Sequence, residues 1–237
     1  MTVFAVVPVK GLDASKKRLS SVLGQHERRL LTEAMLEDVL AALKASIVEH
    51  VLVVSGDSGV EQVAEKFGFS FLLGSRAGLN PAIGEATEWC VRKGAGSVLV
   101  LPADIPLVSC NDINRIIELG SKSTSVVLSP SNDGGTNLLF RNPANLIPPC
   151  FGRRSFLRHF RKANSRGATV KYYSSLGTVL DIDSADDLKK LIQKEKNTIC
   201  AKVLEQLRFQ KGLFAEGNSQ LGTNLFEKLP EAKKLEK

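Results

Sequence analysis

The sequence predicts an α/β protein whose central sheet is mostly parallel and is covered by helices. Short apolar runs rich in β-branched residues occur near 4–9, 51–54 and 98–101, and such runs are typical of strands buried on both faces. The segments between them carry apolar residues at spacings of three and four, which indicates amphipathic helices. Repetition of strand, helix and strand predicts right-handed βαβ units in a doubly wound sheet.

Composition supports one sizeable globular domain. The chain has 237 residues, of which 43% are hydrophobic and 24% charged, which excludes a fibrous or disordered class for most of it. The formal net charge of +7 suits nucleic acid or small anionic ligands. Because no basic helix carries interleaved aromatic residues, we expect a small phosphorylated ligand and no nucleic-acid partner.

The cysteines and the apolar segments give expectations about the compartment. The four cysteines are far apart and form no CxxC pair, so we expect reduced thiols in a cytosolic protein. The chain starts with a strand, not with a signal segment. No apolar run approaches the roughly 20 residues that span a bilayer. We therefore expect a cytoplasmic protein with no membrane partner.

The remaining elements follow from periodicity and turn residues. Ser58 is the expected N-cap of the second helix, and Pro81 stands in the first turn of the third. Gly177 is expected to join the last two strands, and Ser184 with Asp187 forms a capping box for the last helix. The expected helices cover 30–43, 58–67, 81–93, 111–119, 153–162 and 184–192, the last running on towards 207, and the expected further strands cover 125–128, 136–140, 168–173 and 178–180.

The C-terminal part changes in composition. From about Gly212 the chain is rich in glycine, asparagine, lysine and glutamate. We expect one folded domain over 1–210 and a mobile or partly helical tail over 211–237. The apolar stripe of the last helix, with Leu188 and Leu191, is compatible with a homodimer.

A basic loop follows the first strand in the stretch VPVKGLDASKKRL. Lys10, Lys16, Lys17 and Arg18 come directly after the strand, where open α/β sheets bind their ligands. Lysine and arginine together suit a polyphosphate. The alternative is a solvated basic loop. The sequence contains neither a Walker A motif nor a GxGxxG after a strand, which argues against a P-loop NTPase or a dinucleotide dehydrogenase.

Carboxylates follow two other predicted strands. Asp104 stands between two prolines in VLVLPADIPLV, at the end of a buried run. Asp181 and Asp183 alternate in VLDIDSADDL, so both are expected on one face of a strand. Together these carboxylates could hold Mg²⁺, which binds one or two carboxylates with phosphate oxygens. The alternatives are a turn cap for Asp104 and a helix start for Asp183.

Two further motifs carry glycines or polar groups. NDGGTNLLF reads as a hairpin turn or as a strand whose glycines admit a ligand. In FGRRSF, Gly152 precedes a helix with Ser155 in its first turn, which is either a phosphate site or an ordinary basic helix start. His26, His50 and His159 are isolated in the sequence, so we expect them on the surface.

The order of these motifs resembles the 2-phospho-L-lactate guanylyltransferase family. The succession PVK, GLN, PADIPL, DGGTN, FGRRSF and DID covers about the first 195 residues. The resemblance implies a three-layer Rossmann-like sandwich of the nucleotide-diphospho-sugar transferase type. It also implies transfer of GMP from GTP to a small phosphorylated acid, with release of pyrophosphate, in deazaflavin coenzyme biosynthesis. The acceptor stays open between 2-phospho-L-lactate, phosphoenolpyruvate and phosphoglycerate.

The resemblance also implies roles for individual residues. The GTP site would comprise Pro8, Val9, Lys10, Lys16, Arg18, Gly78, Leu79, Asn80 and Asp104. Catalysis would rest on Lys10, Arg18 and Asp104, and Mg²⁺ would bind Asp104, Asp181 and Asp183. The acceptor phosphate would meet Thr136, Gly152 and Ser155.

Other functions remain open at the level of the residues. A molybdenum-cofactor guanylyltransferase or a sugar-phosphate nucleotidyltransferase would share the fold, although both usually carry a glycine-rich loop after the first strand. A glycosyltransferase would fit the aspartates. A non-catalytic nucleotide-binding protein would bind GTP and release no pyrophosphate.

Overall fold

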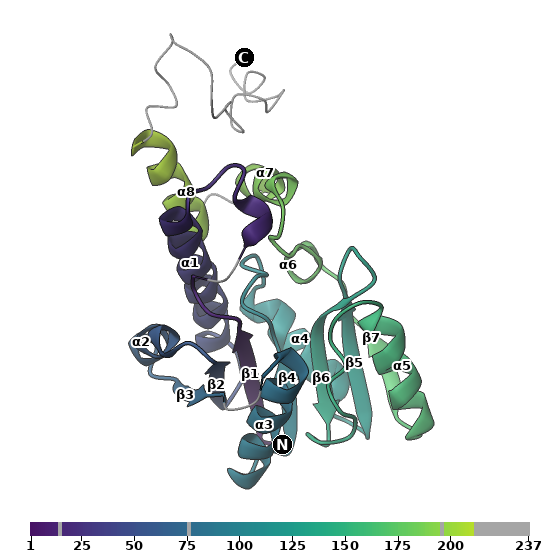
Figure 1. The fold of residues 1–237 in the computed structure, drawn as a ribbon. Helices are drawn as coiled ribbons and strands as arrows, with labels where there is room; N and C mark the ends of the chain where they lie inside the picture. The colour runs from purple at the N-terminus through teal and green to yellow at the C-terminus, as the bar shows by residue number, and fades with distance from the viewer. Residues whose placement is uncertain (14–15, 75–76, 195–196, 211–237) are drawn as a thin grey trace.

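A seven-stranded sheet forms the centre of the computed structural model, which describes residues 1–13, 16–74, 77–194 and 197–210 (Figure 1). Within these residues the strand order is β3-β2-β1-β4-β6-β5-β7. All neighbouring strands are parallel except at β6, which is antiparallel to β4 and to β5. The strands are β1 Val3–Val9, β2 His50–Ser55, β3 Ser70–Leu73, β4 Ser97–Val100, β5 Ser125–Pro130, β6 Thr136–Asn142 and β7 Thr169–Tyr172.

Helices cover both faces of this sheet, so the molecule has three layers (Figure 1). Alternate residues of β1 face the two sides: Val7 belongs to the buried apolar cluster that includes residues of α1 (Gln25–Lys44), α2 (Glu61–Lys66) and α4 (Cys110–Gly120), and Val6 belongs to the cluster that includes residues of α3 (Leu79–Arg92) and α5 (Ser155–Ser165). Burial on both faces explains why the central strands are apolar without interruption. The predicted α/β class and mostly parallel sheet are confirmed.

Two 3₁₀ turns and three further helices complete the described part of the chain. They are the 3₁₀ turns η1 (Lys17–Leu19) and η2 (Ser58–Val60), and the helices α6 (Leu176–Val179), α7 (Ala185–Lys194) and α8 (Ile199–Gln210). The capping box is confirmed, since Ser184 N and Oγ both donate to Asp187 Oδ2, at 3.0 and 2.6 Å. No helix of the described residues is long and apolar enough to cross a membrane. The predicted tail over 211–237 lies outside the described residues.

Some predicted boundaries were wrong. The N-cap before η2 is Asp57, which accepts from Gly59 N at 2.9 Å, and not Ser58. The helix predicted from 153 begins at Ser155, because Arg154 has a left-handed backbone with φ of 54°. Strand β3 was not predicted. It is a four-residue edge strand without a buried run, so its periodicity signal is weak.

The strand predicted over 178–180 is wrong, because residues 176–179 form the helical turn α6. Ser175 and Thr178 cap this turn, with Thr178 N donating to Ser175 Oγ at 3.2 Å. A Cβ on Gly177 would lie 2.3 Å from the carbonyl oxygen of Leu107. Close packing against that backbone therefore requires glycine here. Asp181 and Asp183 consequently follow a helical turn and not a strand.

The predicted continuation of the last helix is also wrong. Residues 197 and 198 are not helical, and α8 begins at Ile199, where Asp38 of α1 caps its start by accepting from Ile199 N at 2.7 Å and from Cys200 N at 2.9 Å. The apolar stripe does not face solvent. Leu188, Leu191 and Leu204 are buried in one cluster with residues of α1 and η1. The stripe therefore gives no argument for a homodimer.

Candidate functional site

A cleft of about 400 Å³ opens at the carboxyl ends of β1 and β4. These two strands are parallel neighbours in the middle of the sheet, and β1 leads to β2 on one side while β4 adjoins β6 on the other. Open α/β sheets bind ligands at such a switch point. The cleft is lined by Pro8, Val9, Lys10, Lys16, Lys17, Arg18, Thr32, Met35, Leu79, Ile83, Pro102, Ala103, Asp104, Phe151 and Asp183.

The loop after β1 is anchored at its start. Leu12 is buried in the core beneath α1, and its backbone N–H donates to Asp57 Oδ2 at 3.0 Å. Gly11 has a φ of +110° and lies against the same carboxylate, where a side chain would be strained. Asp57 thus caps η2 and holds this loop with its two carboxylate oxygens. The anchoring keeps the basic residues that follow over the cleft.

Lys16 joins two of the three expected metal ligands. Its ammonium lies 2.8 Å from Asp183 Oδ1 and 3.1 Å from Asp104 Oδ2, and its side chain is 6% exposed. Burial alone would lower the pKa of Lys16, but the charges and hydrogen bonds of the two carboxylates outweigh it and raise the pKa. Lys16 is therefore charged at neutral pH, and it neutralises the pair.

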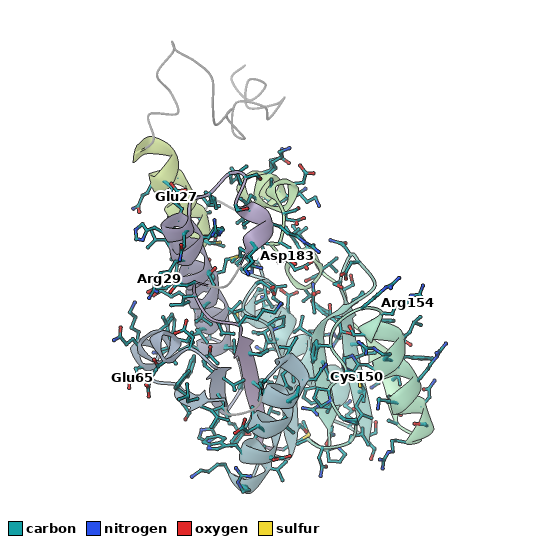
Figure 2. All side chains as sticks on the ribbon, in the orientation of Figure 1. Glu27, Arg29, Glu65, Cys150, Arg154 and Asp183 are labelled. Atoms are coloured by element: carbon teal, nitrogen blue, oxygen red, sulfur yellow. The ribbon has the colours of Figure 1, made fainter. Side chains whose placement is uncertain are left out.

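Asp181 lies near this group without sharing the ammonium. The backbone N–H of Ile182 donates to the carbonyl oxygen of Asp104 at 2.9 Å, which fixes the 181–183 segment beside the end of β4. Leu180 and Ile182 are buried in the cluster with α1, α7 and α8, so the aspartates alternate with anchoring residues. Burial, followed by the carboxylates of Asp104, Asp183 and Asp133, raises the pKa of Asp181. Figure 2 shows Asp183 next to the turn η1.

The described residues hold no ready-made cluster of three or more carboxylate, histidine or cysteine ligands for a metal. Asp104 and Asp183 nevertheless offer oxygen donors on either side of one cation, the ammonium of Lys16. Magnesium commonly binds only one or two carboxylates and completes its shell with phosphate oxygens and water. The donor chemistry of this pair therefore fits Mg²⁺, provided that the ammonium moves aside.

The GLN segment forms the start of α3. Gly78 is the N-cap with a φ of +100°, and Leu79 lines the cleft. The amide of Asn80 is committed to the backbone of Phe151: it accepts from Phe151 N at 2.7 Å and donates to Phe151 O at 3.0 Å. Gly78 and Asn80 are not among the described residues that line the cleft. Asn80 instead ties α3 to the segment before α5.

The three expected acceptor residues form a second group next to Phe151, which itself lines the cleft. Ser155 Oγ donates to Thr136 Oγ1 at 3.1 Å, and both residues are at least 93% buried. Gly152 has a φ of +109° and precedes the start of α5. The structure brings these three residues together, but none of them lines the cleft as the side chains stand.

The DGG stretch is a hairpin turn. Ser131 N donates to Gly135 O at 3.2 Å, and Gly134 has a positive φ of 80°. Hydrogen bonds from the Ser131 hydroxyl and the Gly135 N–H lower the pKa of Asp133, and the positive charge of Arg18 adds to this effect. Arg18 therefore lies within electrostatic reach of the hairpin that starts β6.

The surface position expected for His159 is wrong, since its side chain is fully buried. Its ring nitrogens contact Thr136 Oγ1 at 3.0 Å and Cys150 N at 2.8 Å. Burial, followed by the charges of Arg141, Arg158 and Lys162, lowers the pKa of His159 to about 3. The sequence gives no sign that an isolated histidine is buried. It also does not indicate that Asp57 accepts from Leu12 N–H, or that Asn137 donates to the carbonyl oxygens of Thr178 and Val179.

Curated relatives are similar to this chain over most of their lengths. A phosphoenolpyruvate guanylyltransferase of Rubrobacter xylanophilus is 38% identical over 81% of this chain and 94% of the relative. A 2-phospho-L-lactate guanylyltransferase of Methanothermobacter thermautotrophicus is 36% identical over 88% and 92%. A 3-phospho-D-glycerate guanylyltransferase of Colwellia psychrerythraea is 31% identical over 82% and 96%.

The fold has solved counterparts at low sequence identity. A crystal structure from Desulfovibrio desulfuricans, described as a nucleotide-diphospho-sugar transferase, superposes with a TM-score of 0.74 at 17% identity, covering 87% of this chain and 95% of that one. This likeness confirms the predicted fold type. The sequence model of the family described as "Guanylyl transferase CofC like" matches residues 3–221. The chain therefore belongs to the CofC-like guanylyl transferase family.

Proposed function

We propose that this protein transfers GMP from GTP to a small phosphorylated acid and releases pyrophosphate, in the cytoplasm, as a step of deazaflavin coenzyme biosynthesis. The names of its relatives support the reaction class. The observation that carries the proposal is the cleft at the ends of β1 and β4, where a basic loop faces Asp104 and Asp183. A triphosphate needs positive charge close to its oxygens, and this loop supplies it.

The reaction needs charge neutralisation more than proton transfer. A phosphate oxygen of the acid is anionic at neutral pH, so it can attack without a general base. It forms a bond to the α-phosphorus of GTP, while the bond from that phosphorus to the bridging oxygen breaks and pyrophosphate leaves with the electron pair. The main obstacle is repulsion between two polyanions. Lys10, Lys16 and Arg18, which line the cleft, would reduce that repulsion and stabilise the leaving pyrophosphate.

Asp104, Asp183 and the nearby Asp181 would hold Mg²⁺ in this proposal. When bound, the ion would neutralise phosphate charge and help to orient the triphosphate. The ammonium of Lys16 lies between Asp104 and Asp183 in the structure. In the presence of GTP and Mg²⁺, Lys16 would leave these carboxylates and contact the phosphates. Its long flexible stem suits such a movement.

The acceptor would bind near the group formed by Thr136, Gly152 and Ser155. Helix α5 begins at Ser155, and helix N-termini favour phosphate groups. The relatives differ in the acid that their names give, so the acceptor is one of three candidates: phosphoenolpyruvate, 2-phospho-L-lactate or 3-phosphoglycerate.

A pyrophosphate-release assay tests the proposal. Purified protein is incubated with GTP, Mg²⁺ and each acid in turn, with ATP in place of GTP as a control. We expect release that depends on GTP and on at least one of the acids, with the guanylylated acid identified by mass spectrometry. Binding of GTP without pyrophosphate release for any acid would instead favour a non-catalytic nucleotide-binding protein.

A further inference from the structure

His159 contacts two separate parts of the expected acceptor site from inside the protein. It lies on α5 and has no exposed surface. One ring nitrogen, Nδ1, lies 3.0 Å from Thr136 Oγ1 at the start of β6. The other, Nε2, accepts from the backbone N–H of Cys150 at 2.8 Å, and the ring packs edge-on against Phe151 with centroids 5.1 Å apart. This one side chain thus joins the strand and the segment that flank the expected site.

The two contacts fix the position of the ring proton. A backbone N–H can only donate, so Nε2 facing Cys150 must be unprotonated. A neutral imidazole then carries its proton on Nδ1, which donates to Thr136 Oγ1. A doubly protonated ring would place two donors against each other at Cys150. Burial and the neighbouring charges of Arg141, Arg158 and Lys162 also oppose that state.

The fixed proton in turn orients the hydroxyl of Thr136. Its oxygen accepts from His159 Nδ1–H at 3.0 Å and from the Ser155 hydroxyl at 3.1 Å. A hydroxyl has two acceptor positions and one proton, so both acceptor positions of Thr136 are then used. Its own proton must point away from His159 and Ser155. Such a proton can donate to an anion.

We propose that His159 is a positioning residue of the acceptor site, which directs the Thr136 hydroxyl as a donor towards the phosphate of the acid and holds the 150–152 segment in place. The inference rests on the proposed function, because it takes Thr136, Gly152 and Ser155 as the acceptor site. His159 does not touch the acid. Its contribution is the direction of one hydrogen bond and the placement of one backbone segment.

Three substitutions of His159 separate its two hydrogen bonds. His159→Asn can keep a donor near the position of Nδ1, His159→Gln can keep an acceptor near that of Nε2, and His159→Phe keeps neither. For a neutral hydrogen bond we expect His159→Phe to raise the KM for the acid by about three- to tenfold. The KM for GTP should stay within about twofold, because the expected contacts to the GTP phosphates come from the basic loop and not from Thr136 or Cys150. The KM for the acid should be closer to the wild-type value in His159→Asn than in His159→Gln.

A double-mutant cycle tests the route through Thr136. Thr136→Val removes the hydroxyl and keeps the shape, so adding His159→Gln, which can keep the acceptor for Cys150 N–H, should raise the KM for the acid little further. Independent action would instead multiply the two increases and overturn the proposal. A purely structural role would lower the melting temperature and leave the ratio of the two KM values unchanged, which also overturns it. If His159→Phe does not fold, the comparison of His159→Asn with His159→Gln decides the question.

A measurement on the wild-type protein does not depend on turnover. ¹⁵N NMR of histidine-labelled protein should show the Nδ1–H tautomer of His159, and its signals should shift when phosphoenolpyruvate, 2-phospho-L-lactate or 3-phosphoglycerate is added. The matched control for the substitution His159→Phe is His50→Phe. His50 also packs against a phenylalanine, with centroids 4.5 Å apart, but it is exposed and lies at the opposite end of the sheet. Wild-type protein that transfers GMP to none of the three acids would refute the proposed function. Active wild type with an Nε2–H tautomer, or with unchanged kinetics in the His159 variants, would refute this inference alone.

Discussion

The ammonium of Lys16 lies 2.8 Å from Asp183 Oδ1, although 167 positions separate the two residues in the chain. The same ammonium reaches Asp104 at the end of β4. A buried lysine that bridges two carboxylates holds three segments together: the loop after β1, the segment after β4 and the segment before α7. The site of the proposed reaction is therefore also a structural junction.

Removal of the Lys16 ammonium should affect activity strongly. We expect Lys16→Ala to lower kcat/KM by about 10²–10³, as for other single contacts that stabilise transition-state charge. Steady-state pyrophosphate release measures the effect. Lys66→Ala is the matched control, since Lys66 also contacts two carboxylates, Glu33 and Glu37, but its side chain is 56% exposed. Equal losses in both variants would contradict the role of Lys16.

Substitution of Asp104 tests the metal proposal. Asp104→Asn keeps the shape and removes the charge, so we expect activity with Mg²⁺ to fall by at least about 10². The wild type should also gain thermal stability when Mg²⁺ and GTP are added together, and the variant should gain less. Differential scanning fluorimetry measures this difference. Full activity of Asp104→Asn at the same Mg²⁺ concentration would rule out the metal role.

Substitution of Asn80 should weaken binding of the acceptor acid more than binding of GTP. Both polar groups of its amide bind the backbone of Phe151, so Asn80→Ala leaves that N–H and C=O without these partners. We expect a loss of about 1–3 kcal/mol in the free energy of unfolding. We also expect a higher KM for the acid, because Phe151 adjoins Gly152. A rise confined to the KM for GTP would show that Asn80 contacts the nucleotide directly.

Ser155 is expected to contribute to binding of the acid. Its hydroxyl donates to Thr136 Oγ1 at the start of α5. Ser155→Ala removes that hydroxyl with little change in volume, and the KM for the acid should rise more than the KM for GTP. Initial-rate measurements with one substrate varied at a time distinguish the two values. The reverse pattern would assign Ser155 to the nucleotide side.

Acid should destabilise the protein through His159. Its pKa is about 3 in the folded protein against 6.5 in an unfolded chain, so the unfolded state binds an extra proton between these values. The stability from this group is complete above about pH 6.5 and is lost as pH falls towards 3, at up to about 1.4 kcal/mol per pH unit. Urea unfolding at several pH values measures the slope. His159→Gln should reduce it, and an unchanged slope would contradict the prediction.

The strands that carry the site could be predicted from the pattern of apolar residues alone. Short continuous apolar runs rich in β-branched residues are typical of strands buried on both faces, and so β1, β2 and β4 were predictable together with the edge of the sheet where Lys10 and Asp104 emerge. The capping box at Ser184 and Asp187 was also predictable, because its hydrogen-bonding groups lie within one helical turn. Local patterns report local structure.

The contacts between distant side chains could not be predicted in this way. The pairing of Lys16 with Asp183, of Asn80 with Phe151 and of His159 with Thr136 depends on how distant segments pack, which no spacing in the sequence encodes. At 176–179 the predicted strand is replaced by a helical turn that Ser175 and Thr178 cap, and Gly177 of this turn packs too closely against the Leu107 backbone for a larger residue. Short-range propensities are worth only about 1 kcal/mol per residue or less, so contacts in the core can outweigh them.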